Sequence, residues 1–321
     1  MNIIVTGAAG FIGSYIAEEL LNQGNTVVGV DNINDYYDVN LKLWRLENLK
    51  KKSKFNFYKV DIENLTALKE VFQANQPEAV INLAARAGIR YSVENPFVYL
   101  STNSLGNLNL LELCREFNIS KYILASSSSL YAGHDMPFNE SLPVNNPTSP
   151  YAASKKSAEA LAYTYHYLYE IDVTIFRYFT VYGPSARPDM SIFRFTKWIM
   201  EGTPLEIFGD GNQLRDFTYI DDIVHGTLKG LVNSGFEIYN LGNNHPEKLL
   251  KVIELIEKYT DKKAELIYKE PHKADMFATG ADISKAKKIL NWHPEVSLEE
   301  GIKRTVEWSK ENWNWLKDIS L

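Results

Sequence analysis

The chain has 321 residues, which allows one large domain or two of moderate size and permits a substantial buried core. Its 45% hydrophobic and 23% charged residues exclude a disordered or low-complexity protein. The net charge of −6 argues against nucleic acid as a partner, and the single cysteine, Cys114, cannot form a disulfide within the chain. No apolar run is long enough to span a membrane, so we expect a cytoplasmic protein.

The first half of the chain alternates short β-branched runs with amphipathic stretches of helical length. This pattern predicts strands at 2–5, 26–30, 55–60, 79–83, 121–125 and 173–177, and helices at 15–21, 65–75, 105–117 and 154–169. Such alternation requires a parallel sheet with helices on both faces. We therefore predict an α/β fold of the Rossmann type, a doubly wound parallel sheet.

The second half is less regular, because glycine and proline recur after Tyr178 and helical patterns return only at 249–259, 284–290 and 298–312. We divide the chain into a first domain at 1–178 and a smaller α/β part at 179–321. One segment of the second part is expected to return to the first domain.

A glycine-rich turn follows the first strand, with Gly7, Gly10 and Gly13 at intervals of three where a strand passes into a helix. Gly7 permits the tight turn, Gly10 lets backbone amides approach a pyrophosphate, and Gly13 lets the helix pack close to the sheet. Asp31 ends the next strand, where a carboxylate binds ribose hydroxyls and repels a 2′-phosphate. The pattern predicts NAD as cofactor; a plain tight corner is the weaker alternative.

Further residues are expected around this cofactor. Asp61 and Ile62 follow the third strand, where they would hold the adenine, although a loop-capping role for Asp61 stays equally open. The same site is expected to include Phe11, Ile12 and Asn32.

Tyr151 and Lys155 open a helical pattern after Pro150 and stand one turn apart on the same face. A free phenol titrates near pH 10, and a lysine cation with an oxidised nicotinamide would lower that pKa toward neutrality. Tyr151 would then be a usable base for a sugar hydroxyl. The alternative is a surface tyrosine that packs on a lysine stem.

The predicted strand at 121–125 leads into the serine run 126–129, at the strand end where doubly wound sheets place their chemistry. A hydroxyl there can relay a proton, and a polar loop is the alternative for at least two of the four serines. This segment holds no Asp or Glu, so an elimination that needs a second acid and base is disfavoured.

Together these motifs resemble the extended short-chain dehydrogenase/reductase family, whose nucleotide-sugar epimerases and dehydratases hold NAD tightly. The resemblance covers nearly the whole chain, and it assigns NAD binding to 1–178 and UDP-sugar binding mainly to 179–321. It implies that Ser127, Tyr151 and Lys155 are catalytic. Beyond Tyr151 and Lys155, it places the following residues near the cofactor: Leu83, Ala84, Ala85, Asn103 and Tyr178.

Within that family, the stretches 31–38, 87–92, 180–184 and 187–190 look like those of UDP-glucuronate 4-epimerases. Galactose-type epimerases usually have asparagine where this chain has Thr180. The resemblance implies interconversion of UDP-glucuronate and UDP-galacturonate by oxidation at C4, rotation of the 4-keto sugar and return of the hydride.

A C6 carboxylate needs hydroxyl and guanidinium donors, which Ser129, Thr180 and Arg187 would supply. We expect this set to hold the carboxylate near the ring plane and prevent loss of carbon dioxide. The resemblance also makes Arg215 a diphosphate ligand and Asp275 a uridine ribose ligand, with a turn-capping role nearly as plausible for Asp275. The other expected substrate contacts are Arg90, Ser127, Ser128 and Tyr151.

Other readings of the same residues are a UDP-glucose or UDP-N-acetylglucosamine 4-epimerase with Arg187 idle, a decarboxylase or dehydratase, and a non-catalytic NAD-binding regulator. Stretches 105–117 and 154–169 resemble the family's dimer-forming helices and favour a homodimer. The six histidines lack metal-ligand spacing, so no metal is expected. Four tyrosines make the second stretch aromatic: Tyr163, Tyr165, Tyr167 and Tyr169.

Overall fold

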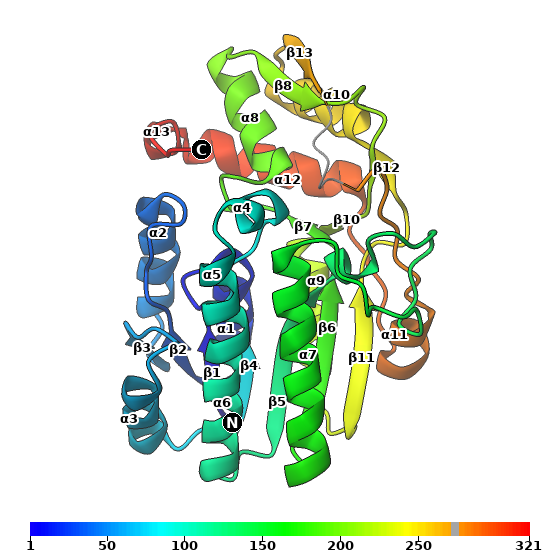
Figure 1. Cartoon of the computed structure of the whole chain (residues 1–321). Coiled ribbons are helices and arrows are strands. Elements are labelled where there is room, and N and C mark those ends of the chain that lie inside the picture. The colour runs from blue at the N-terminus through cyan, green and yellow to red at the C-terminus, as the bar shows by residue number, and fades with distance from the viewer. Residues whose placement is uncertain (271–275) are drawn as a thin grey trace.

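The computed structural model describes residues 1–270 and 276–321, and its body is a seven-stranded parallel sheet. The order across the sheet is β11-β6-β5-β4-β1-β2-β3 (Figure 1). The strands are β1 (Asn2–Thr6), β2 (Thr26–Val30), β3 (Phe55–Tyr58), β4 (Ala79–Asn82), β5 (Lys121–Ser127), β6 (Asp172–Tyr178) and β11 (Phe236–Leu241). The α/β doubly wound fold expected from the sequence is confirmed.

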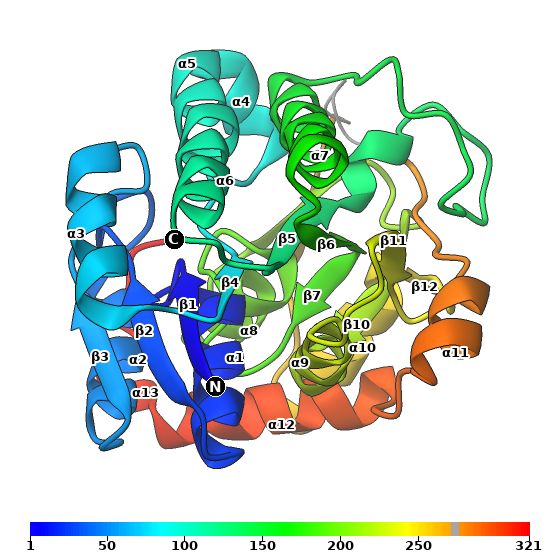
Figure 2. The same ribbon diagram turned by 90° about the horizontal axis from the view of Figure 1, so that it is seen from below.

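Helices cover both faces of this sheet, as Figure 2 shows from below. One face carries α3 (Leu65–Asn75), α6 (Asn107–Glu116) and α7 (Pro150–Tyr169), and the other carries α1 (Phe11–Asn22), α2 (Val39–Lys50) and α9 (Ile220–Lys229). Along β1, Ile3 and Val5 belong to one hydrophobic core while Ile4 belongs to the other. Because both faces are buried, the central strands are continuously apolar.

A smaller part of the chain lies over the carboxyl ends of the strands (Figure 1). Its helices are α8 (Ser191–Glu201), α10 (Leu249–Thr260), α12 (Leu298–Glu311) and α13 (Trp313–Leu316). Within the described residues, three strand pairs lie outside the large sheet: β7 (Thr180–Tyr182) with β10 (Phe217–Tyr219), β9 (Leu214–Arg215) with β12 (Glu247–Lys248), and β8 (Leu205–Phe208) with β13 (Leu266–Lys269).

Short helical segments connect these elements. They are α4 (Ile89–Glu94), α5 (Pro96–Tyr99), the π-helical η1 (Leu100–Gly106), the 3₁₀ segment η2 (Ser128–Tyr131) and α11 (Ser284–Leu290). Over residues 1–270 and 276–321, no helix combines the length and apolarity that crossing a membrane requires.

Two elements of the sheet body lie at ranges where none was predicted, 236–241 and 39–50. Strand β11 pairs with β6 in parallel, Phe236 opposite Val173, so the second half of the chain supplies the edge strand of the large sheet. Helix α2 buries Lys42 and Arg45 along with its leucines, which hides the usual apolar stripe. The division of the chain at residue 178 stays a prediction.

Candidate active site

A cavity of about 1100 Å³ opens between the carboxyl ends of the strands and the smaller part. It is lined by the glycine turn, the serine segment, the start of α7, β7, Arg187, residues 189–191 and β9. The residues expected around cofactor and substrate line this cavity with two exceptions. Asn103 does not line it, and Asp275 lies outside the described residues.

The glycine turn has the geometry of a phosphate cradle. Gly7 adopts φ +69°, its amide donates to the Val30 carbonyl at 2.8 Å, and a Cβ on it would lie 2.8 Å from the Ala84 nitrogen. A Cβ on Gly13 would lie 2.8 Å from the carbonyl carbon of Gly7. Helix α1 begins here without a side-chain cap, so the turn fits a pyrophosphate held by backbone amides.

Two carboxylates follow this turn along the cavity. Asp31 is buried and accepts hydrogen bonds from the backbone amides of Ala9 at 3.1 Å and Ile33 at 2.8 Å. Asp61 accepts from the Asn32 side chain at 2.6 Å and from the Glu63 amide at 2.9 Å. Asp61 therefore caps its loop and also lines the cavity, so the two roles considered for it are compatible.

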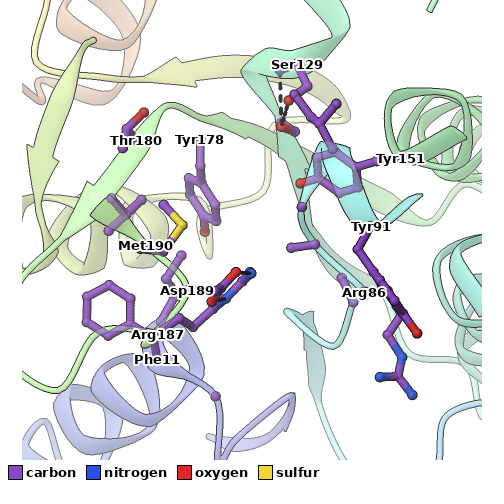
Figure 3. Close-up of a pocket in the computed structure, with 18 of the residues that line it drawn as sticks. Phe11, Arg86, Tyr91, Ser129, Tyr151, Tyr178, Thr180, Arg187, Asp189 and Met190 are labelled. Carbon is purple, nitrogen blue, oxygen red and sulfur yellow. Dashed lines mark hydrogen bonds and ion pairs between the residues drawn. The ribbon is translucent and has the colours of Figure 1, made fainter. Parts of the chain in front are cut away.

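The serine run and helix α7 bring three expected catalytic groups to one wall. The Ser127 hydroxyl donates to the Ser129 hydroxyl at 3.1 Å and accepts from the Ser129 amide at 3.1 Å (Figure 3). Lys155 is buried, and its ammonium donates to the Ala125 carbonyl at 2.7 Å. Tyr151 is also buried and lines the cavity.

The chain's own groups set the charges of this wall. Burial raises the pKa of Tyr151, against the lowering effects of Ser127 and Arg187. Burial lowers the pKa of Lys155 to about 8, against the raising effect of Glu159. The lowering of the Tyr151 pKa expected from the sequence does not come from the protein groups, and it would need the positive charge of an oxidised nicotinamide.

The carboxylate-binding candidates converge from separate elements. Arg187 and Asp189 lie across the cavity from Ser129 and Tyr151 in Figure 3. The Arg187 Nε and Nη2 donate to the Asp189 carboxylate at 3.0 and 2.5 Å, and its guanidinium carbon lies 5.6 Å from the centre of the Tyr36 ring. Burial opposes the Arg187 charge, but Asp189 outweighs it and the pKa of Arg187 is raised.

Three expected residues also bind other parts of the protein. The buried Asn103 amide accepts from the Arg86 amide at 2.8 Å and donates to the Arg86 carbonyl at 2.9 Å, so it supports the cavity wall rather than facing the cofactor. Tyr178 lines the cavity with its ring, while its hydroxyl pairs with Thr227 at 2.7 Å. Arg215 donates to the Phe277 carbonyl at 3.1 Å at the other end of the cavity.

Several lining residues were missed from the sequence. Tyr36, Lys42 and Arg86 line the cavity, and Lys42 donates to the Asn34 carbonyl at 2.7 Å. Burial lowers the pKa of Lys42 to about 8. Beyond Asp31 and Asn32, the stretch 33–38 was noted only for its resemblance, and no pattern in it revealed which side chains turn inward.

Comparison with known proteins places the chain in a family. The model of the GDP-mannose 4,6 dehydratase family matches residues 4–305. The chain belongs to this family. This confirms the resemblance to NAD-dependent nucleotide-sugar epimerases and dehydratases drawn from the sequence.

Individual relatives are more specific than the family description. The chain is 58% identical over 319 residues to a protein of Thermodesulfobacterium geofontis named UDP-glucuronate 4-epimerase, a match that covers 99% of each. The UDP-glucuronic acid 4-epimerase of Bacillus cereus, solved with UDP-glucuronic acid and NAD, is 39% identical with a TM-score of 0.92, covering 97% of this chain and 100% of that one. The UDP-glucose 4-epimerase of Thermotoga maritima, solved with UDP-glucose, is 34% identical with a TM-score of 0.89, covering 98% and 100%.

Proposed function

We propose that this chain is an NAD-dependent 4-epimerase that interconverts UDP-glucuronate and UDP-galacturonate. One observation carries the proposal: a single cavity holds both the Ser127, Tyr151 and Lys155 wall and an arginine, Arg187, placed to meet a carboxylate across it. The bacterial relatives named UDP-glucuronate 4-epimerase support this substrate.

NAD, when bound on the glycine turn, supplies a hydride acceptor and donor at C4 of the sugar. Tyr151 takes the proton of the 4-hydroxyl, and Ser127 bridges that hydroxyl and the phenol. The Lys155 ammonium stabilises the phenolate from the same face of α7. Because the sugar is anchored by its UDP, the flat 4-keto ring can turn over and present its other face, and Tyr151 then returns the proton.

The 4-keto form of a glucuronate is a β-keto acid, which loses carbon dioxide when its C5–C6 bond aligns with the carbonyl π-system. We propose that Ser129, Thr180 and Arg187 hold the carboxylate close to the ring plane and prevent that alignment. The buried hydroxyl of Ser129 and the intermediate exposure of Thr180 place both at the cavity wall.

A homodimer and a cytoplasmic location belong to the same proposal. On α7, Tyr163, Tyr167 and Tyr169 are exposed by 52%, 74% and 46%, and such aromatic surface favours an interface. Tyr165 instead packs inward against the sheet and hydrogen-bonds Glu112. The single cysteine, Cys114, is buried and requires no oxidising compartment.

The decisive experiment incubates the purified protein with UDP-glucuronate and, separately, with UDP-glucose, and identifies the products by NMR without added reductant. We expect UDP-galacturonate from the first and no change in the second. UDP-galactose alone would remove the carboxylate-binding role of Arg187. A UDP-pentose as the main product would mean that the enzyme is a decarboxylase.

A further inference from the structure

Arg45 joins the cofactor turn to the loop that precedes Arg187. This side chain comes from α2 and is 2% exposed. Its Nη1 donates to the Ala9 carbonyl at 3.1 Å, within the glycine turn. Its Nε and Nη2 donate to the Ser185 carbonyl at 3.0 and 2.5 Å. One guanidinium therefore ties the cofactor turn to the loop that leads to Arg187.

The acceptors of Arg45 are all neutral. Besides Ala9 and Ser185, they are the Tyr37 hydroxyl at 2.8 Å and the Ala186 carbonyl at 3.3 Å. Among the ion pairs recorded for residues 1–270 and 276–321, none includes Arg45. A buried charge without an anionic partner is costly, but an apolar side chain would leave these acceptors without the hydrogen bonds that Arg45 donates. The guanidinium is therefore held in place by its bonds to the two segments.

The loop that Arg45 grips is conformationally unusual. Ser185 has φ +52°, a left-handed conformation that a serine adopts only when its surroundings impose it. The carbonyl that Arg45 holds with two nitrogens is that of Ser185 itself. Tyr15 adds a hydrogen bond to the Pro184 carbonyl at 3.0 Å. These contacts fix the backbone direction two residues before Arg187.

We propose that Arg45 is a positioning residue that holds the Arg187 loop against the cofactor turn. It thereby prevents loss of the substrate carboxylate as carbon dioxide. The inference rests on the proposed function and deepens it. Arg45 touches neither the carboxylate nor C4, so its effect passes through the backbone of residues 185 and 186. A shift of the Arg187 guanidinium by about 1 Å is enough to lose control of the position of the substrate carboxylate.

The lost control has a defined chemical outcome. In the 4-keto intermediate the C5–C6 bond breaks, carbon dioxide leaves, and the electron pair stays on C5 as an enolate that takes up a proton. The hydride taken from C4 in the first step then returns to C4, which gives a UDP-pentose and restores the cofactor. No reagent beyond those of the main reaction is needed.

The test replaces Arg45 with lysine, which keeps the charge and cannot reach both segments at once. The exposed Lys50 at the end of the same helix, changed to methionine, is the matched control. NMR measures the ratio of UDP-pentose to UDP-galacturonate formed from UDP-glucuronate. We expect R45K to raise this ratio by about tenfold or more and K50M to leave it unchanged.

A second variant covers the case in which R45K does not fold. Ser185→Gly relieves the left-handed backbone and loosens the loop while Arg45 stays in place. We expect a smaller rise in the same ratio, with circular dichroism reporting the folded state of each variant. Folded R45K and S185G proteins with the wild-type ratio would overturn the role of Arg45 alone. A wild-type protein that leaves UDP-glucuronate unchanged would instead overturn the proposed function as well.

Discussion

The charge of Lys155 should make the activity depend on pH. Burial lowers its pKa to about 8, so its ammonium is present below that pH and is lost above it. If the cation stabilises the Tyr151 phenolate, kcat for UDP-glucuronate falls as pH rises through about 8. We expect this alkaline limb in a profile from about pH 6 to about pH 10, and we expect Lys155→Met to remove it together with most of the activity.

The lowered pKa of Lys155 also makes the free energy of unfolding depend on pH. In the unfolded chain a lysine titrates near pH 10.4, so between about 8 and 10.4 the unfolded state binds more protons than the folded state. The contribution of Lys155 to the free energy of unfolding therefore increases with pH over that window. A denaturation series in which Lys155→Met leaves the pH dependence of stability unaltered would contradict the burial of this charge.

Arg187 is the second residue whose charge can be tested. Loss of one charge-assisted hydrogen bond to a substrate carboxylate weakens binding by about 1.5–3 kcal/mol, so we expect Arg187→Ala to raise KM for UDP-glucuronate by roughly 10-fold to 100-fold. UDP-pentose should accompany the remaining UDP-galacturonate. Arg187→Lys, which keeps the charge without the bidentate geometry, serves as the comparison. Wild-type KM and product in R187A would contradict its role.

Two helices, α7 and α12, begin with serine N-caps of the same geometry, which allows a controlled comparison. The Ser149 hydroxyl accepts from the Ala152 amide at 3.2 Å and caps α7, and the Ser297 hydroxyl accepts from the Glu300 amide at 3.2 Å and caps α12. Each serine-to-alanine change should lower the free energy of unfolding by about 1 kcal/mol in urea denaturation.

Only one of these two caps belongs to the helix that carries Tyr151 and Lys155. We therefore expect S149A to reduce kcat as well, while S297A leaves kcat at the wild-type value. Equal kcat in the two variants would show that the first turn of α7 holds Tyr151 without its cap.

The sequence predicted those elements whose pattern follows a single rule. The strand at 26–30 and the helix at 65–75 agree with the structure at both ends, because a β-branched run and an amphipathic repeat identify them directly. Helix α2 was missed because its inward face carries Lys42 and Arg45. The helix predicted at 105–117 begins only at Asn107, because residues 100–106 form π-helical turns, which no periodicity reveals.

The site residues, too, were predicted correctly where a motif fixes their spacing. Gly7, Tyr151 and Lys155 belong to motifs whose spacing dictates their placement, and each lines the cavity. Asn103 was placed by resemblance alone, and the structure shows its amide bound to the backbone of Arg86. Arg45 could not be found from sequence, since the carbonyls of Ala9 and Ser185 that it binds lie 36 and 140 positions away along the chain.

At the scale of the whole molecule, the last residues fasten the smaller part to the sheet body. Leu316 and Ile319 form a buried cluster with Leu41 of α2 and Phe193 of α8. The Ser320 amide adds a hydrogen bond to the Asp38 carboxylate at 2.8 Å. Residues 316–320 thereby join α2 of the sheet body to α8 of the smaller part.

The contribution of this cluster to stability can be tested with two leucine-to-alanine variants. Leu316 is 2% exposed and Leu321 is 45% exposed. We expect Leu316→Ala to cost about 2–5 kcal/mol in the free energy of unfolding, because it leaves a cavity in the cluster. Leu321→Ala should change stability by less than about 0.5 kcal/mol. Comparable losses in the two variants would place the cluster outside the cooperative core.

The same junction contains three indoles in mutual contact. Trp44 of α2 stacks on Trp315 with ring centres 5.5 Å apart and meets Trp308 edge-on at 5.4 Å. Indoles this close share their electronic transitions, so the native protein should show an exciton couplet in circular dichroism. Trp44→Phe should weaken this couplet, and the remaining Trp308–Trp315 pair, with ring centres 6.0 Å apart, should keep part of it. Trp44 precedes Arg45 in the chain, and any movement of α2 that follows cofactor binding at the glycine turn would change the intensity of this couplet. The enzyme thus carries an intrinsic optical probe at the junction between the sheet body and the smaller part.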